Sequence, residues 1–135
     1  MEIVVSSEGS EWFLETCKRE WGEWKVLNNY SNKTKIKELI VLPGHSLSWQ
    51  KHEYRNELWF IREGTATVHY SMDTQGEIVY VKRLKKHQNF ILYADRWHQL
   101  SNEGENILSV IEIQFGSNCA ESDIVRKPRA SSTVE

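Results

Sequence analysis

Apolar residues in this chain come in short runs rich in Val, Ile, Thr and aromatic side chains, a composition typical of β-strands. Six such runs predict strands at residues 23–27, 34–42, 57–61, 65–70, 77–84 and 107–115. Turn-forming residues separate the runs at short intervals, with Pro43-Gly44 and Asn102-Glu103-Gly104 as clear examples. Many short strands with turns and without intervening helices predict an antiparallel sandwich or barrel.

Helical periodicity is nearly absent. The segment 8–20 is the one place where we expect a turn or two of helix, with Trp12, Phe13 and Cys17 on one side. From residue 126 onward the chain is polar, contains Pro128 and has no apolar pattern, so we expect a flexible tail over residues 126–135. Residues 1–125 are expected to form a single domain.

Composition then excludes several function classes. The chain has 135 residues, including six Trp, which suffices for one domain with one core. No apolar run approaches the roughly 18 residues of a membrane span, and the acidic N-terminal segment lacks the features of a signal peptide. A formal net charge of -2 provides no field that would draw the chain to nucleic acid or anionic lipid. We therefore expect a cytoplasmic protein with no membrane partner and no nucleic-acid partner.

Two smaller features have a plain interpretation. The basic run at residues 81–87 could be a phosphate or nucleic-acid patch, but the nearly neutral chain favours a solvated loop. Cys17 and Cys119 are too few and too far apart for a disulfide framework or a zinc knuckle, so we expect free thiols.

The residues most informative about function are side chains at strand ends that could bind a metal. Gln50 and His52 lie two residues apart, so both side chains point to the same face of an extended segment. Glu57 begins the next strand, and His98 stands at the end of a later one. Imidazole, carboxylate and amide oxygen together suit a divalent transition metal, and such a site keeps positions open for water or substrate.

We expect one divalent metal at these four residues, zinc in the first place, with manganese, iron or nickel as alternatives. The competing interpretation is that His52 and His98 are ordinary polar residues at strand ends and that Glu57 is exposed at a strand start. His45 and His87 are expected to face solvent, and the orientation of His69 stays open.

The spacing of these residues resembles the two motifs of the cupin superfamily. The first motif has a Gly, a His-x-His pair, a Glu and a closing Gly, and the second ends in a His followed four residues later by Asn. The matching positions are Gly44, Gln50-x-His52, Glu57 and Gly64, and then His98 and Asn102. Gln50 stands where the first His usually stands, and Tyr93-Ala94-Asp95 replaces the usual Pro-x-Gly. The resemblance implies a double-stranded β-helix, a jelly-roll barrel of about eight to ten strands around a central cavity.

Within the cupins, the chain resembles the cupin domain of type II mannose-6-phosphate isomerases over about residues 19–126. The matching segments are Glu20-Trp21-Gly22, Lys35-x-Lys37, Pro43-Gly44, the stretch from Ser46 to His52, Arg55-Asn56-Glu57-Leu58-Trp59, Ile111-Glu112-Ile113-Gln114-Phe115-Gly116 and Glu121-Ser122-Asp123-Ile124-Val125-Arg126. This resemblance implies a metal-dependent isomerase that interconverts an aldose phosphate and a ketose phosphate. It implies Glu112 and Arg126 as catalytic candidates and Lys37 as a substrate-phosphate contact.

Two departures keep alternatives open. The family's histidine run is reduced to His52-Glu53-Tyr54, and its Tyr-Gly-Arg ending is replaced by Lys127-Pro128-Arg129. The runner-up is therefore a non-catalytic cupin that binds metal and sugar, and a third interpretation is an iron-dependent oxygenase. We also expect a homodimer, because Leu58 and Phe60 should form an apolar outer face if Glu57, Trp59 and Ile61 point inward.

Overall fold

The computed structural model describes residues 4–5, 12–13 and 15–134, and every regular element in these ranges is a β-strand. The first of two six-stranded sheets contains, in spatial order, β10 (Asn89–Leu92), β7 (Arg55–Glu63), β12 (Leu108–Gly116), β5 (Thr34–Val41), β4 (Gly22–Ser31) and β3 (Glu15–Arg19). The second contains β13 (Val125–Arg126), β6 (Gln50–Lys51), β11 (His98–Ser101), β8 (Ala66–Tyr70), β9 (Val79–Leu84) and β14 (Thr133–Val134). A short pair, β1 (Val4–Val5) and β2 (Trp12–Phe13), precedes them.

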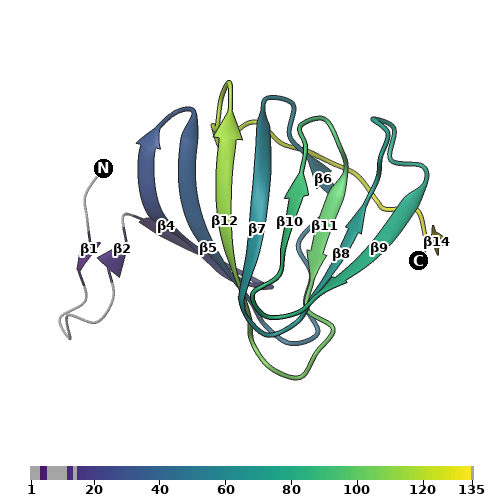
Figure 1. Ribbon diagram of the computed structural model, residues 1–135, viewed down its shortest axis with the longest axis horizontal. Coiled ribbons are helices and arrows are strands. Elements are labelled where there is room, and N and C mark those ends of the chain that lie inside the picture. Colours follow the sequence, from purple (N-terminus) through teal and green to yellow (C-terminus); the bar gives the residue numbers. More distant parts are fainter. Residues whose placement is uncertain (1–3, 6–11, 14, 135) are drawn as a thin grey trace.

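The strand order is that of a jelly-roll barrel. Neighbouring strands are antiparallel except β14, which runs parallel to β9. Strands far apart in the sequence lie side by side, since β12 lies between β5 and β7, and β11 lies between β6 and β8 (Figure 1). The predicted all-β double-stranded β-helix is confirmed. All six predicted strands are present, with β7 and β4 longer than expected.

The expected N-terminal helix is wrong where the structure describes it. Residues 15–19 form strand β3, which pairs with β4 so that Cys17 lies opposite Trp24. Backbone pairing with a long neighbouring strand overrides the weak local preference of this polar segment. Residues 8–11 and 14 of the expected helix lie outside the described residues.

Side chains on the inner face of the first sheet change from apolar to polar along the strands. Ile61, Val110 and Leu39 lie in one cross-strand row and belong to the main hydrophobic core, which also receives residues of the second sheet. One row further along, Trp59 lies opposite Glu112, and Glu112 lies opposite Lys37. Strand alternation directs all of these side chains inward, so the barrel has an apolar end and a polar end.

Side chains along β7 alternate between the inside and the outside of the barrel, as expected from the sequence. Trp59 and Ile61 are buried, while Leu58 is half-buried and Phe60 is exposed. The strand ends at Glu63 and is followed by Gly64, whose φ of 83° is a left-handed conformation that favours glycine. A Cβ at this position would stand 2.8 Å from the carbonyl oxygen of Ile107, so the close approach of these two loops also needs glycine.

The last described residues run along the second sheet. β13 pairs with β6, the Lys127 N–H donates to Trp49 O at 3.3 Å, and Ala130 packs against the buried pair Trp49 and Trp97. The domain limit at residue 125 and the flexibility of residues 126–135 stay predictions.

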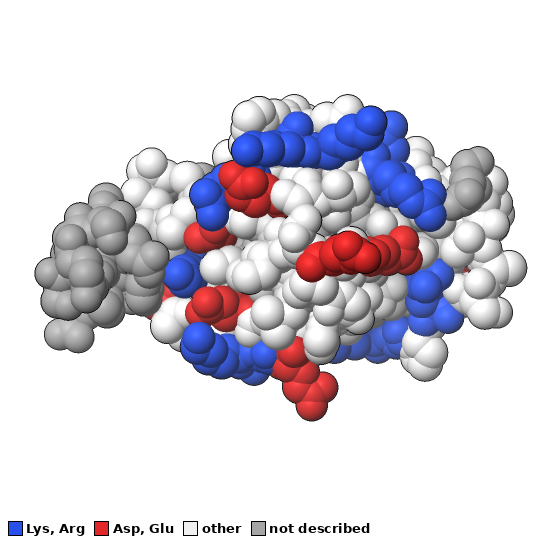
Figure 2. Space-filling view, turned by 90° about the horizontal axis from the view of Figure 1, so that it is seen from below, with Lys and Arg blue, Asp and Glu red and all other residues white. Residues whose placement is uncertain are grey.

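Surface properties agree with a globular chain of mixed charge. Basic and acidic side chains both occur on the face shown in Figure 2, so neither sign covers it. Lys82, Arg83, Lys85 and Lys86 are exposed, as expected, but Lys82 and Arg83 lie on strand β9 and not in a loop. None of the described residues belongs to a helix long and apolar enough to cross a membrane.

Candidate metal centre

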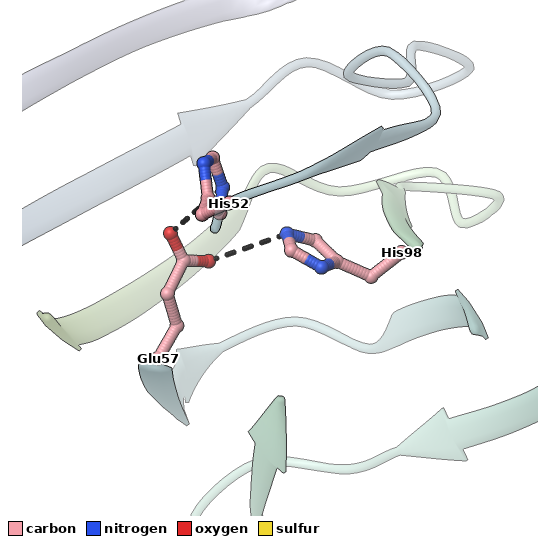
Figure 3. Close-up of side chains that lie close together, drawn as sticks. All are labelled: His52, Glu57 and His98. Carbon is pink, nitrogen blue, oxygen red and sulfur yellow. Dashed lines mark ion pairs between the residues drawn. The ribbon is translucent and has the colours of Figure 1, made fainter. Parts of the chain in front are cut away.

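Three of the four expected ligands lie together at the polar end of the barrel. His52 follows β6, Glu57 lies near the start of β7 and His98 begins β11, so both sheets contribute (Figure 3). One ligand atom from each residue can be chosen so that all three lie within 4.8 Å of one another. His52 Nε2 is 3.2 Å from Glu57 Oε2, and His98 Nε2 is 3.5 Å from Glu57 Oε1.

Burial makes this cluster unusual for polar residues. Each of the three side chains is only 2% exposed. His98 Nε2 is buried and makes no hydrogen bond, and Glu57 Oε1 lies 3.5 Å away, so this nitrogen is only weakly compensated. A divalent cation would compensate that atom and the Glu57 carboxylate together, so the residues present fit a metal.

The ring nitrogens that point away from Glu57 are held by backbone carbonyls. His52 Nδ1 donates a hydrogen bond to Asp123 O at 2.7 Å, and His98 Nδ1 donates to Arg96 O at 3.2 Å. In a neutral imidazole, this arrangement leaves the lone pair on Nε2. Both Nε2 atoms face Glu57, while the opposite ring nitrogens contact backbone carbonyls, as is common in histidines that bind metals.

The pKa shifts agree with a carboxylate held among cationic and imidazole groups. Burial by itself would raise the pKa of Glu57, but His52, His98 and Arg55 together hold it well below its usual value. Burial would likewise lower the pKa of His52, but the Glu57 carboxylate outweighs it and raises that pKa. Burial lowers the pKa of His98 despite Glu57.

Gln50, the fourth expected ligand, lies beside this cluster. It is buried, its backbone pairs with that of His98 across β6 and β11, and its side chain lines the same cavity as His52 and Glu57. Its role as a ligand stays a prediction.

The cluster opens into a cavity of about 410 Å³ between the two sheets. Glu112 lies on its wall, only 4% exposed. Trp59 Nε1 donates to Glu112 Oε2 at 2.9 Å, and Gln114 Nε2 donates to Glu112 Oε1 at 2.7 Å. Burial, and then the charge of Glu57, raise the pKa of Glu112 to about 7. This carboxyl group can therefore both release and accept a proton near neutral pH.

The two other expected site residues line the same cavity. Lys37 is buried, pairs with Glu121 and places its ammonium 4.1 Å from the centre of the Trp24 ring. Arg126 donates from Nε to Ser48 Oγ at 3.2 Å. The structure thus brings all seven expected residues to the cavity or its metal cluster.

Several residues around the site were missed by the sequence reasoning. Arg55 contacts the cluster directly, Asp123 holds His52 and the backbone after it, and Arg19 lines the cavity from β3. Arg55 and Asp123 occur in segments that resemble the isomerase family, but neither position had a role assigned. Arg19 could not be placed at the cavity because a helix was expected there.

The other histidines and the two cysteines can also be compared with the expectations from the sequence. His45 and His87 are exposed as expected, and His69, whose orientation was open, is buried. Cys17 and Cys119 are free thiols, as expected.

Comparison with known proteins agrees with this architecture. Residues 8–128 match the family model described as "Mannose-6-phosphate isomerase C-terminal". The xanthan biosynthesis protein XanB of Xanthomonas campestris pv. campestris is 36% identical over 108 residues, which cover 80% of this chain and 21% of that protein. A mannose-1-phosphate guanylyltransferase of Salmonella muenchen is 32% identical over 117 residues, covering 87% of this chain and 23% of that protein. The chain therefore spans about a fifth of the length of these curated relatives.

Similar solved structures share the fold at low sequence identity. The capsular polysaccharide assembling protein CapF from Staphylococcus aureus matches with a TM-score of 0.75 and 13% identity, covering 90% of this chain and 36% of that one. An uncharacterised double-stranded β-helix protein from Klebsiella pneumoniae matches with a TM-score of 0.63 and 17% identity, covering 78% and 83%. These similarities establish the fold alone.

Proposed function

The chain belongs to the mannose-6-phosphate isomerase C-terminal family and has the cupin fold, and from this premise we propose that it is a metal-dependent sugar-phosphate isomerase. The reaction would interconvert an aldose phosphate and a ketose phosphate, as in mannose-6-phosphate isomerases. The observation that carries the proposal is the buried His52, Glu57 and His98 cluster beside a cavity that also holds Glu112. We place the activity in the cytoplasm.

A divalent cation held by His52, Glu57 and His98, with Gln50 as fourth ligand, would supply Lewis-acid stabilisation of negative charge on the substrate's oxygen atoms. We propose zinc first, with manganese, iron or nickel as alternatives. Backbone carbonyl groups hold the two histidines in place, so the protein provides a partly preformed site.

Glu112 is the candidate for proton transfer. Isomerisation of an open-chain aldose to a ketose moves one proton from C2 to C1 and another from the C2 hydroxyl to the C1 oxygen. A single carboxyl group can accept the carbon-bound proton and return it. In the metal-free protein, burial and the charge of Glu57 raise the pKa of Glu112 to about 7, so this carboxyl group is present in both protonation states at neutral pH. Trp59 and Gln114 hold both carboxyl oxygens, which keeps the group in one orientation.

Two positively charged side chains are candidates for binding the substrate's phosphate. Arg126 lies on the wall of the cavity with a guanidinium that can bind a phosphate through two N–H groups. Lys37 would add a point charge from the cavity wall, where Glu121 already neutralises part of it. We assign the direct phosphate contact to Arg126.

A second candidate function, sugar binding without catalysis, is favoured by the end of the chain. Arg129, which stands in the segment that replaces the family's Tyr-Gly-Arg ending, donates from Nε to Gln99 Oε1 at 2.8 Å. It is thus occupied on β11 and does not line the cavity. An iron-dependent oxygenase is the third candidate, because histidine and carboxylate ligands also suit non-haem iron.

Elemental analysis of the purified protein, followed by a coupled assay with mannose 6-phosphate on the same sample, tests these proposals. About one zinc per chain with turnover supports the isomerase. Metal without turnover favours the binding cupin, and oxygen uptake by an iron-loaded sample favours the oxygenase. Absence of metal would contradict the metal centre itself.

A further inference from the structure

We propose that Arg55 competes with the metal for its site, so that its guanidinium stands in for the cation in the metal-free protein and weakens metal binding. This inference rests on the proposed metal centre. It concerns a residue that has no role in the function proposed above.

The contacts of Arg55 converge on the ligand atoms. Nε and Nη2 lie 3.0 and 2.9 Å from Glu57 Oε2, so two N–H groups share one carboxylate oxygen. Nη2 also lies 3.3 Å from His52 Nε2. The side chain is only 7% exposed, and this burial strengthens its attraction to Glu57. A single cationic group therefore contacts two of the three ligands.

The contact with His52 distinguishes a competitor from a supporting residue. Supporting residues usually contact the ring nitrogen that does not bind metal, as Asp123 O does at Nδ1 of His52. Arg55 instead contacts Nε2, the nitrogen whose lone pair a cation needs. A metal and a guanidinium cannot both use that lone pair, so metal binding must break this contact.

Electrostatic repulsion between Arg55 and a metal ion would also weaken metal binding. Two positive groups near one buried carboxylate repel each other, and the interior screens them poorly. Arg55 has other partners to which it can turn, because Nη1 lies 3.4 Å from Ala120 O and the charges of Glu112 and Glu121 also act on it. Glu57 Oε1, which Arg55 does not contact, is the oxygen left for the cation.

Zinc titration of the chelator-treated full chain tests the proposal, with calorimetry for affinity and thermal unfolding for stability. Arg55→Met removes the charge while keeping an extended side chain, and we expect at least tenfold tighter zinc binding. Its metal-free Tm should fall, since Glu57 loses its cation, and zinc should restore most of that loss. Arg62→Met is the matched control, because Arg62 is also on β7 and paired with a carboxylate, that of Glu38, outside the site. Its zinc affinity should equal that of the unaltered protein.

Arg55→Lys provides a second variant in case the metal-free Met variant does not fold. An ammonium group cannot present the same fork of N–H groups to Glu57 and His52, so zinc should bind more tightly than in the unaltered protein. Equal or weaker zinc binding by the folded Arg55 variants would overturn the proposal and make Arg55 a supporting residue. Absence of zinc binding by the unaltered protein and by the variants alike would instead overturn the metal centre.

Discussion

Trp59 connects the candidate proton-transfer group to the metal cluster through Glu112 and His98. Its indole N–H donates to Glu112 Oε2 at 2.9 Å, and its ring meets the His98 ring edge-on with centroids 5.5 Å apart. One side chain therefore contacts both the carboxyl group proposed to move the proton and a proposed ligand of the metal.

The raised pKa of Glu112 predicts a pH-dependent stability in the metal-free protein. Folded Glu112 keeps its proton up to a pKa of about 7, whereas the unfolded chain loses it near the ordinary value of 4.5. Between these values the folded state binds more protons, so stability falls as pH rises and then levels off above the folded pKa. The size of this fall is about 3 kcal/mol.

Glu112→Gln has no proton to lose at this position. Urea unfolding should therefore show the variant gaining about 3 kcal/mol relative to the unaltered protein as pH increases from below 4.5 to above 7. A stability difference that stays constant over that range would contradict the pKa assigned to Glu112. Isomerase turnover should be lost in the same variant at every pH.

His98→Ala should abolish both metal binding and turnover. The substitution removes one of three clustered ligands and leaves Glu57 with one imidazole partner. Elemental analysis after dialysis and the coupled assay measure the two effects. His45→Ala is the control, because that histidine is exposed in a turn and should leave both unchanged. Full activity of His98→Ala would refute the site.

Arg126→Ala should raise KM for the sugar phosphate by about tenfold with a smaller change in kcat. The reason is the loss of a charge-assisted contact to the phosphate, and tenfold corresponds to about 1.4 kcal/mol. Steady-state kinetics measure the two constants separately. Arg129→Ala removes a nearby cation that is bonded to Gln99, and its KM should not change. Equal KM values for the unaltered protein, Arg126→Ala and Arg129→Ala would exclude Arg126 from phosphate binding.

The outer face of the first sheet predicts a homodimer. Apolar side chains of four neighbouring strands, β10, β7, β12 and β5, alternate to this face in matching register: Ile36, Leu58, Phe60, Ile91, Ile111, Ile113 and Phe115. Of these, Phe60, Ile91 and Phe115 are exposed, and the others are half-buried. Monomers rarely expose a continuous apolar strip of this kind, and a second copy would cover it.

Light scattering at micromolar concentration should give the mass of two chains, and Phe60→Lys should reduce it to one. Met72→Lys changes an exposed residue outside the strip and should leave the dimer intact. A one-chain mass for the unaltered protein would show that the face is not a dimer interface.

The sequence predicted the fold well where local preference and tertiary pairing agree. The run at residues 34–42 is rich in Ile, Leu and Val, and β5 covers all but its last residue. Residues 15–19 show the opposite case, because their strand exists only through pairing with β4. The local sequence does not indicate that such a neighbouring strand will be present.

The candidate site also contains residues that the sequence predicts and residues that it does not. The clustering of His52, Glu57 and His98 could be predicted, because metal binding requires particular residue types and strand alternation directs residues at such spacings to one face. The place of Arg55 depends on the direction of a long side chain, which spacing does not fix. Asp123 supports His52 with its backbone carbonyl, a group that every residue carries.

The contact between Asp123 and His52 has a consequence for the order in which this protein forms on the ribosome. The two residues are 71 positions apart, and the Asp123 carboxylate also accepts the N–H groups of Glu53 and Tyr54. Until that late segment has emerged, the nascent chain holds His52 without its anchor, and closing so long a loop is slow. Capture of a metal ion at the proposed centre should therefore wait until residue 123 has emerged and paired with His52.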